Sequence, residues 1–171
     1  MNILLTGGMG YIGSHTALSL LEQGHEVTIL DNLINSNISV LHSIQSISSV
    51  QLNFVQGDVL DTAIVKETLK KFDINAVIHL AGLKAVGESV MNPLIYYKNN
   101  IQGTLNLVNA CKNSKVKNII FSSSCSVYGN CKGSVNEKKK PNPQGYYAYT
   151  KFKGEKIIKK FAKKYQYKYA I

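Results

Sequence analysis

Two tyrosine–lysine pairs, each spaced by four residues, stand near the C-terminal end of the sequence: Tyr147 with Lys151, and Tyr149 with Lys153. In a helix this spacing places a phenol and an ammonium on one face, about one turn apart. Free tyrosine has a pKa near ~10, and a neighbouring cation lowers that pKa because it favours the phenolate. Such a pair can take a proton from a hydroxyl group while the ammonium holds a ribose. The alternative is a packing tyrosine beside a lysine whose stem covers apolar surface.

The pattern of the predicted helix over residues 146–165 decides between the two pairs. The stripe that begins with Tyr147 and Lys151 continues through Gly154, Ile158, Phe161 and Tyr165, which is typical of a face packed on a sheet. The stripe that begins with Tyr149 and Lys153 continues through Lys156, Lys160 and Lys163, which is typical of a face in water. We therefore predict that Tyr147 and Lys151 do the chemistry. Ser124, beyond a predicted strand at 118–121, is the serine placed to share the substrate's oxygen.

Glycines between the first apolar run and the first predicted helix indicate a cofactor site. Gly8, Gly10 and Gly13 fit G-x-G-x-x-G, and Gly7, Gly10 and Gly13 fit the related G-x-x-G-x-x-G. Glycines permit a tight turn and let backbone N–H groups approach a pyrophosphate, and the helix N-terminus adds partial positive charge. Asp31 ends the next apolar run, at the spacing of an acid that holds a ribose 2′-hydroxyl. These features predict NAD binding, against the alternative of a turn that binds nothing.

Strands alternate with helices along the whole chain, which predicts an α/β fold with a doubly wound parallel sheet of the Rossmann type. The expected strands are 2–6, 27–31, 51–56, 76–81, 118–121 and a sixth beginning at 167–171. The expected helices are 14–23, a weak one around 40–47, 61–72, 93–113 and 146–165, with a loop between 82 and 92. Functional residues should lie beyond the carboxyl ends of the strands.

Composition narrows the classes of partner. Residues 1–130 hold eight lysines and eight acids, whereas residues 131–171 hold twelve lysines against Glu137 and Glu155, so the whole net charge of +10 lies in the last segment. No arginine is present, which argues against a nucleic-acid binder, and a solvated lysine-rich helix face is the preferred interpretation. No apolar run is long enough to predict a membrane span. Three cysteines without C-x-x-C spacing predict free thiols in the cytoplasm, and the four histidines share no metal-ligand spacing.

Longer motifs resemble the extended short-chain dehydrogenase/reductase family, and within it the branch that epimerises UDP-hexoses at C4. The resemblance covers all 171 residues and rests on the segments 6–15 (TGGMGYIGSH), 30–33 (LDNL), 79–89 (HLAGLKAVGES) and 121–129 (FSSSCSVYG). The segment 81–89 is the most particular to that branch. The family pattern around the catalytic tyrosine is met by Ala148, Thr150 and Glu155 only when Tyr147 is that tyrosine.

The resemblance implies a set of site residues. The catalytic residues would be Ser124, Tyr147 and Lys151, which would also contact the cofactor. The other NAD contacts would come from Gly7, Gly10, Tyr11, Ile12, Gly13, Asp31, Asn32, Leu33, Ile34, Asn35, Ser36, Asp58, Val59, Leu80, Ala81, Gly82, Leu83, Lys84 and Asn99.

The resemblance also implies a reaction and its partners. Tyr147 would take the proton from the 4-hydroxyl of a UDP-hexose, UDP-glucose or UDP-galactose, and a transient 4-keto sugar would be reduced on its other face. A related 4,6-dehydratase is the alternative, but Cys125-Ser126 stands where dehydratases carry an acidic pair. Residues 1–171 would be an NAD-binding domain without the C-terminal substrate domain. A non-catalytic NAD-binding fragment is therefore a further alternative, and a homodimer is the expected form at full length.

Overall fold

A single six-stranded parallel sheet organises the protein, in the order β3-β2-β1-β4-β5-β6. The computed structural model describes residues 1–171. The strands are β1 (Asn2–Thr6), β2 (Glu26–Asp31), β3 (Asn53–Gln56), β4 (Ala76–His79), β5 (Asn118–Phe121) and β6 (Lys168–Ala170). The order reverses between β1 and β4, so the carboxyl ends of these strands flank a crevice, as in doubly wound folds. The predicted doubly wound Rossmann-type sheet is confirmed.

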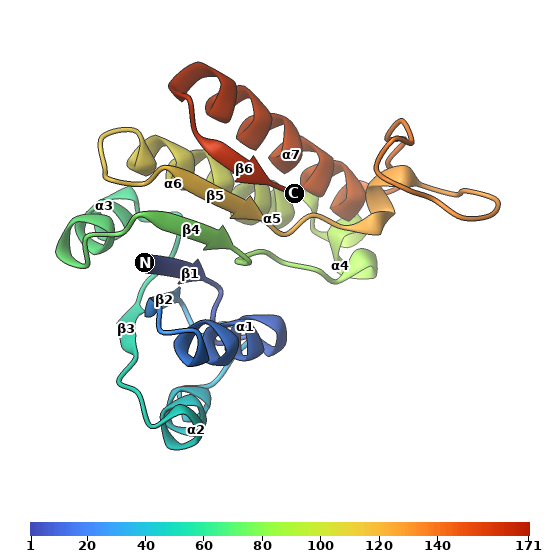
Figure 1. Cartoon of the computed structure of the whole chain (residues 1–171). Coiled ribbons are helices and arrows are strands. Elements are labelled where there is room, and N and C mark those ends of the chain that lie inside the picture. The colour runs from blue at the N-terminus through green and yellow to red at the C-terminus, as the bar shows by residue number, and fades with distance from the viewer.

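Helices cover both faces of the sheet (Figure 1). They are α1 (Tyr11–Glu22), α2 (Ser39–Ser48), α3 (Thr62–Lys71), α4 (Val86–Met91), α5 (Pro93–Tyr96), the π-helix η1 (Tyr97–Gln102), α6 (Gly103–Cys111), the 3₁₀ turn η2 (Cys125–Tyr128) and α7 (Tyr146–Tyr165). Successive β1 residues point to opposite faces: Leu4 packs in the larger core cluster with α3, α6 and α7, and Leu5 packs in the smaller one with α1 and α2. The centre of the sheet, at β1, is therefore buried on both faces.

Helix α7 has the predicted bounds, and its predicted stripe is the inward face. Lys151, Gly154, Ile158 and Phe161 are buried, whereas Tyr149 is exposed. Cys111 is buried in α6, where it packs in the larger core cluster.

Two local predictions are wrong. The segment predicted as a loop between 82 and 92 contains α4, whose exposed Val86, Val90 and Met91 hide the helical period. The helix predicted over 93–113 is interrupted by the π-helix η1 and ends at Cys111.

No helix combines the length and apolarity that a membrane crossing requires.

The sheet ends on one side at β6, which pairs in parallel with β5 so that Ile119 lies beside Tyr169. The phenol of Tyr167 donates a hydrogen bond to the Cys111 carbonyl (2.7 Å) and fixes the entry to this strand. Tyr169 and Ile171 remain exposed, as does Ile120 on β5. Because successive side chains alternate between the faces of a strand and Ile120 pairs with Ala170, Ile120 and Tyr169 lie on opposite faces, so this end of the sheet exposes apolar side chains on both faces.

Candidate cofactor and proton-transfer site

The glycine turn between β1 and α1 is too tight for any side chain at two positions. Gly7 has φ +71°, and a Cβ there would lie 2.6 Å from the Ala81 nitrogen. A Cβ on Gly13 would lie 2.6 Å from the Gly7 carbonyl oxygen. The first turn of α1 is thereby pressed against the end of β1, and its free N–H groups face outward at the carboxyl edge of the sheet. This geometry suits an anionic pyrophosphate.

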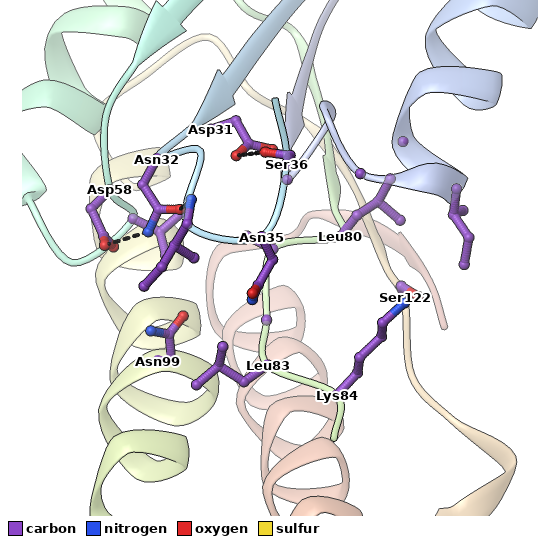
Figure 2. Close-up of a pocket in the computed structure, with 18 of the residues that line it drawn as sticks. Asp31, Asn32, Asn35, Ser36, Asp58, Leu80, Leu83, Lys84, Asn99 and Ser122 are labelled. Atoms are coloured by element: carbon purple, nitrogen blue, oxygen red, sulfur yellow. Dashed lines mark hydrogen bonds between the residues drawn. The ribbon is translucent and has the colours of Figure 1, made fainter. Parts of the chain in front are cut away.

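A cavity of about 550 Å³ opens at this edge, beside the glycine turn (Figure 2). Of the residues predicted to contact the cofactor, all but Leu33, Ser124, Tyr147 and Lys151 line it. Leu33 instead packs against the smaller core cluster. Five lining residues were not predicted: Leu30, Gly57, Ala85, Glu88 and Ser122. The cavity brings together the ends of β1, β2, β3 and β4, so segments far apart in sequence share one site.

Asp31 is tied into this cavity on both oxygens. The Met9 amide donates to Oδ2 (3.0 Å), and the Leu33 amide and the Ser36 hydroxyl both donate to Oδ1 (2.9 Å each). A carboxylate has about four acceptor positions, so one remains on Oδ2 for a ribose hydroxyl. Asp31 thus holds the glycine turn as well as facing the cavity, a structural role that its position in the sequence did not reveal.

A second acid anchors the far wall of the cavity. The Asn32 side chain donates to Asp58 Oδ2 (2.8 Å), and the Leu60 amide donates to Asp58 Oδ1 (2.8 Å). Figure 2 shows the Asn32–Asp58 and Asp31–Ser36 hydrogen bonds as dashed lines. The Asn32–Asp58 bond joins the loops after β2 and β3, and the other bonds order each loop internally.

Lys151 lies directly behind the cavity wall. Its ammonium donates a hydrogen bond to the carbonyl of Ser122 (2.9 Å), which lines the cavity. Gly82 also lines the cavity, and Lys151 Nζ lies 3.6 Å from the point that a Cβ on Gly82 would occupy. Only 7% of the residue is exposed, and burial lowers the pKa of Lys151 from 10.5 to about 8. Lys151 is therefore still mainly in its protonated form at neutral pH, and its ammonium stands next to the cavity.

Tyr147 precedes Lys151 by one turn of α7 and is held through its backbone. Its amide donates to the hydroxyl of Ser89 (3.1 Å), and its carbonyl accepts a hydrogen bond from Thr150 Oγ1 (2.7 Å). Ser124 lies beyond the end of β5 and caps η2, where its Oγ accepts from the Ser126 amide (3.2 Å) and bonds the Ser126 hydroxyl (2.8 Å). The three predicted catalytic residues thus come from α7 and the adjoining turn.

Asn100, in the π-helix η1, links the cavity wall to α7. Its Oδ1 accepts from the Leu83 amide (2.8 Å), and its Nδ2 donates to the Leu83 carbonyl (2.9 Å) and to Thr150 Oγ1 (3.0 Å). Only 5% of Asn100 is exposed. Sequence reasoning missed this residue because a helix with the ordinary period gives no reason to single it out.

The carboxylate of Glu155 fixes the turn that receives Lys151. Its Oε1 accepts from the Ser123 hydroxyl (2.7 Å), and its Oε2 accepts from Lys159 (3.2 Å). Because Ser123 stands between Ser122 and Ser124, this bond holds the whole serine turn onto α7.

His79, at the end of β4, is a structural group. Its ring nitrogens form hydrogen bonds with Thr6 (2.6 Å) and Thr104 (3.0 Å). Burial, aided by the charge of Lys151, lowers the pKa of His79 to about 3.

The family that shares this architecture is identified by sequence. The model of the NAD dependent epimerase/dehydratase family matches residues 3–171, and the chain belongs to that family. The resemblance inferred from the motifs is therefore confirmed.

Individual relatives are similar along most of this chain. A UDP-glucose 4-epimerase from Klebsiella pneumoniae is 55% identical over 129 residues, which are 75% of this chain and 93% of that sequence. A UDP-glucose 4-epimerase from Pasteurella multocida is 46% identical over 95% of this chain and 49% of its own length. The crystal structure of UDP-glucose-4-epimerase from Stenotrophomonas maltophila with bound NAD and formylated UDP-arabinopyranose superposes with a TM-score of 0.93 at 40% identity, covering 96% of this chain and 49% of that one. The chain thus spans about half the length of the last two relatives.

Proposed function

We propose that this chain provides the NAD site and the proton-transfer groups of an enzyme that epimerises a UDP-hexose at C4, interconverting UDP-glucose and UDP-galactose. The observation that carries the proposal is the placement of Lys151: a buried ammonium touches the wall of a cavity built by a glycine turn, one helical turn from Tyr147. The UDP-glucose 4-epimerase similar to this chain that was crystallised with NAD and a UDP-sugar supports the same assignment.

The residues have distinct roles in this proposal. The cavity residues Gly7, Gly13 and Asp31 would hold NAD, which would supply the hydride chemistry: removal of the hydride from C4 of the sugar and its return to the opposite face of the 4-keto sugar. Tyr147 takes the proton of the 4-hydroxyl onto its phenolate oxygen and gives it back when the hydroxyl is restored. Lys151 holds a ribose hydroxyl of the cofactor, since its ammonium is fixed by Ser122 at the cavity wall. Ser124 hydrogen-bonds the sugar's 4-oxygen as its charge changes.

The same site disfavours one other reaction and one other cofactor. A 4,6-dehydratase needs an acid and a base near C5 and C6 of the sugar, and the residues after Ser124 are Cys125 and Ser126. A preference for NADP would place a 2′-phosphate against the carboxylate of Asp31, which lines the cavity. NAD and epimerisation therefore fit the residues present.

The test is conversion of UDP-galactose carrying deuterium at C4. It is measured with NAD on the chain and on a chimera in which the remainder of the Pasteurella multocida relative follows residue 171. We expect the chimera to form UDP-glucose with the deuterium still on C4, since the hydride leaves and returns within one site. Loss of the deuterium to solvent would contradict the mechanism. NAD binding by both proteins without any conversion would instead favour a non-catalytic NAD-binding chain.

A further inference from the structure

Helix α7 lacks a cap of its own at the end that carries Tyr147. Its N-cap residue is Gly145, at φ +86°, which has no side chain to accept from the first N–H groups of the helix. An N-cap side chain ordinarily accepts from the second or third residue of the helix. In α7 the second residue is Tyr147 itself, and its amide is satisfied from elsewhere in the chain.

The acceptor is Ser89, which lies 58 positions earlier, in α4. Its hydroxyl donates to the Val86 carbonyl (2.6 Å), so the oxygen lone pairs are left for the Tyr147 amide at 3.1 Å. Ser89 is fully buried, with 0% exposed. Water therefore cannot replace the hydroxyl as a partner of this N–H group without rearrangement.

The segment that holds Ser89 is also part of the cavity wall. Ala85 and Glu88 line the cavity, and both are bonded to the buried phenol of Tyr96, which lies 2.8 Å from the Ala85 carbonyl and 2.8 Å from Glu88 Oε2. Tyr96 is itself 0% exposed. The Tyr96 phenol thus anchors the first turn of the short helix α4, which presents Ser89 to α7.

The backbone of Tyr147 is consequently held from two sides by the cavity wall. Ser89 receives its N–H group, and its carbonyl is bonded to Thr150, which Asn100 joins to Leu83. We propose that Ser89 is a positioning residue: as a helix cap supplied by α4, it couples the cofactor-side wall to the placement of the Tyr147 phenol. The contact stands on geometry alone, whereas its effect on turnover rests on the function proposed above.

The test compares Ser89→Ala, Ser89→Thr and Ser114→Ala. Ser114 is the matched control, because its hydroxyl also donates to a carbonyl three residues earlier (Cys111, 2.8 Å) but caps no second helix. Amide hydrogen exchange in the 171-residue chain reports the contact directly. In Ser89→Ala we expect the Tyr147 amide to exchange about tenfold faster or more, as for a lost hydrogen bond, with protection regained in Ser89→Thr and unchanged in Ser114→Ala.

Turnover of UDP-galactose by the chimera reports the consequence. For Ser89→Ala we expect kcat to fall by about tenfold or more with KM within twofold, and we expect Ser89→Thr to recover it, because a misplacement of about 1 Å near reacting groups can lower a rate by ~10². Unchanged kcat together with faster exchange would overturn the positioning role, and unchanged exchange would overturn the contact. If the unsubstituted chimera has no turnover, the proposed function fails, and the exchange of the Tyr147 amide alone decides whether Ser89 caps α7.

Discussion

Replacing Lys151 by methionine should change how the stability of the fold depends on pH. Burial lowers the pKa of Lys151 from 10.5 to about 8. Below pH 8 the folded protein therefore holds the charged ammonium in its interior, where it is solvated less well than in the unfolded chain. Between about pH 8 and 10.5 the folded chain has released this proton while the unfolded chain still holds it. The free energy of unfolding of the unsubstituted protein therefore rises with pH across that window, through this group.

The magnitude follows from the size of the shift. A pKa displaced by about 2.5 units corresponds to about 3 kcal/mol of differential stability between pH 7 and pH 10.5. In Lys151→Met this contribution is absent. Between pH 7 and pH 10.5 the unsubstituted protein should therefore gain about 3 kcal/mol of unfolding free energy relative to Lys151→Met. Lost hydrogen bonds and packing shift both ends equally and cancel in the comparison.

Urea unfolding followed by far-UV circular dichroism at steps from pH 7 to pH 10.5 measures this difference. Lys156→Met is the control, since the Lys156 side chain is on the exposed face of the same helix. A difference between Lys151→Met and the unsubstituted protein that stays constant with pH would refute the reasoning, because Lys151 would then titrate in the fold as it does in solvent.

Three further predictions concern the cofactor site and the surface. The Asp31 carboxylate should make the dissociation constant for NAD lower than that for NADP, as measured by isothermal titration calorimetry, and equal or tighter NADP binding would contradict the role given to it. Gly13→Ala should abolish NAD binding in the same titration, because the added carbon meets the Gly7 carbonyl at 2.6 Å, whereas Gly87→Ala, whose added carbon meets nothing within 4 Å, should bind as before. The exposed Val90, Met91, Leu94 and Tyr169 should make the chain self-associate, so light scattering should give a mass that grows with protein concentration, and a constant monomer mass would count against this.

The parts of the fold that could be predicted from sequence were those with a regular period. The face of α7 was predictable because lysines fill one stripe and apolar residues the other, and the buried strands were predictable as continuous apolar runs. The cavity-lining glycines and Asp31 could be located because turn chemistry and strand ends mark them in sequence. These signals are all local.

The contacts that hold the site together could not be found in this way. Ser89 and Asn100 act across 58 and 50 positions, and neither has a neighbour in sequence that indicates its partner. The helix α4 was missed because it is short and its apolar residues face solvent, so the burial that produces a period is absent. The second role of Asp31, bonding the Met9 amide, depends on how two loops meet at the sheet edge and is visible only in three dimensions.

In the proposed function Tyr147, and not Tyr149, transfers the proton. Turnover of UDP-galactose by the chimera carrying Tyr147→Phe or Tyr149→Phe, with NAD binding measured in parallel, tests it most directly. We expect Tyr147→Phe to lower kcat by roughly 10² to 10⁴ while NAD still binds, as for a lost general base, and Tyr149→Phe, on the exposed face, to leave kcat within about twofold. A large loss in Tyr149→Phe with Tyr147→Phe still active would contradict the account.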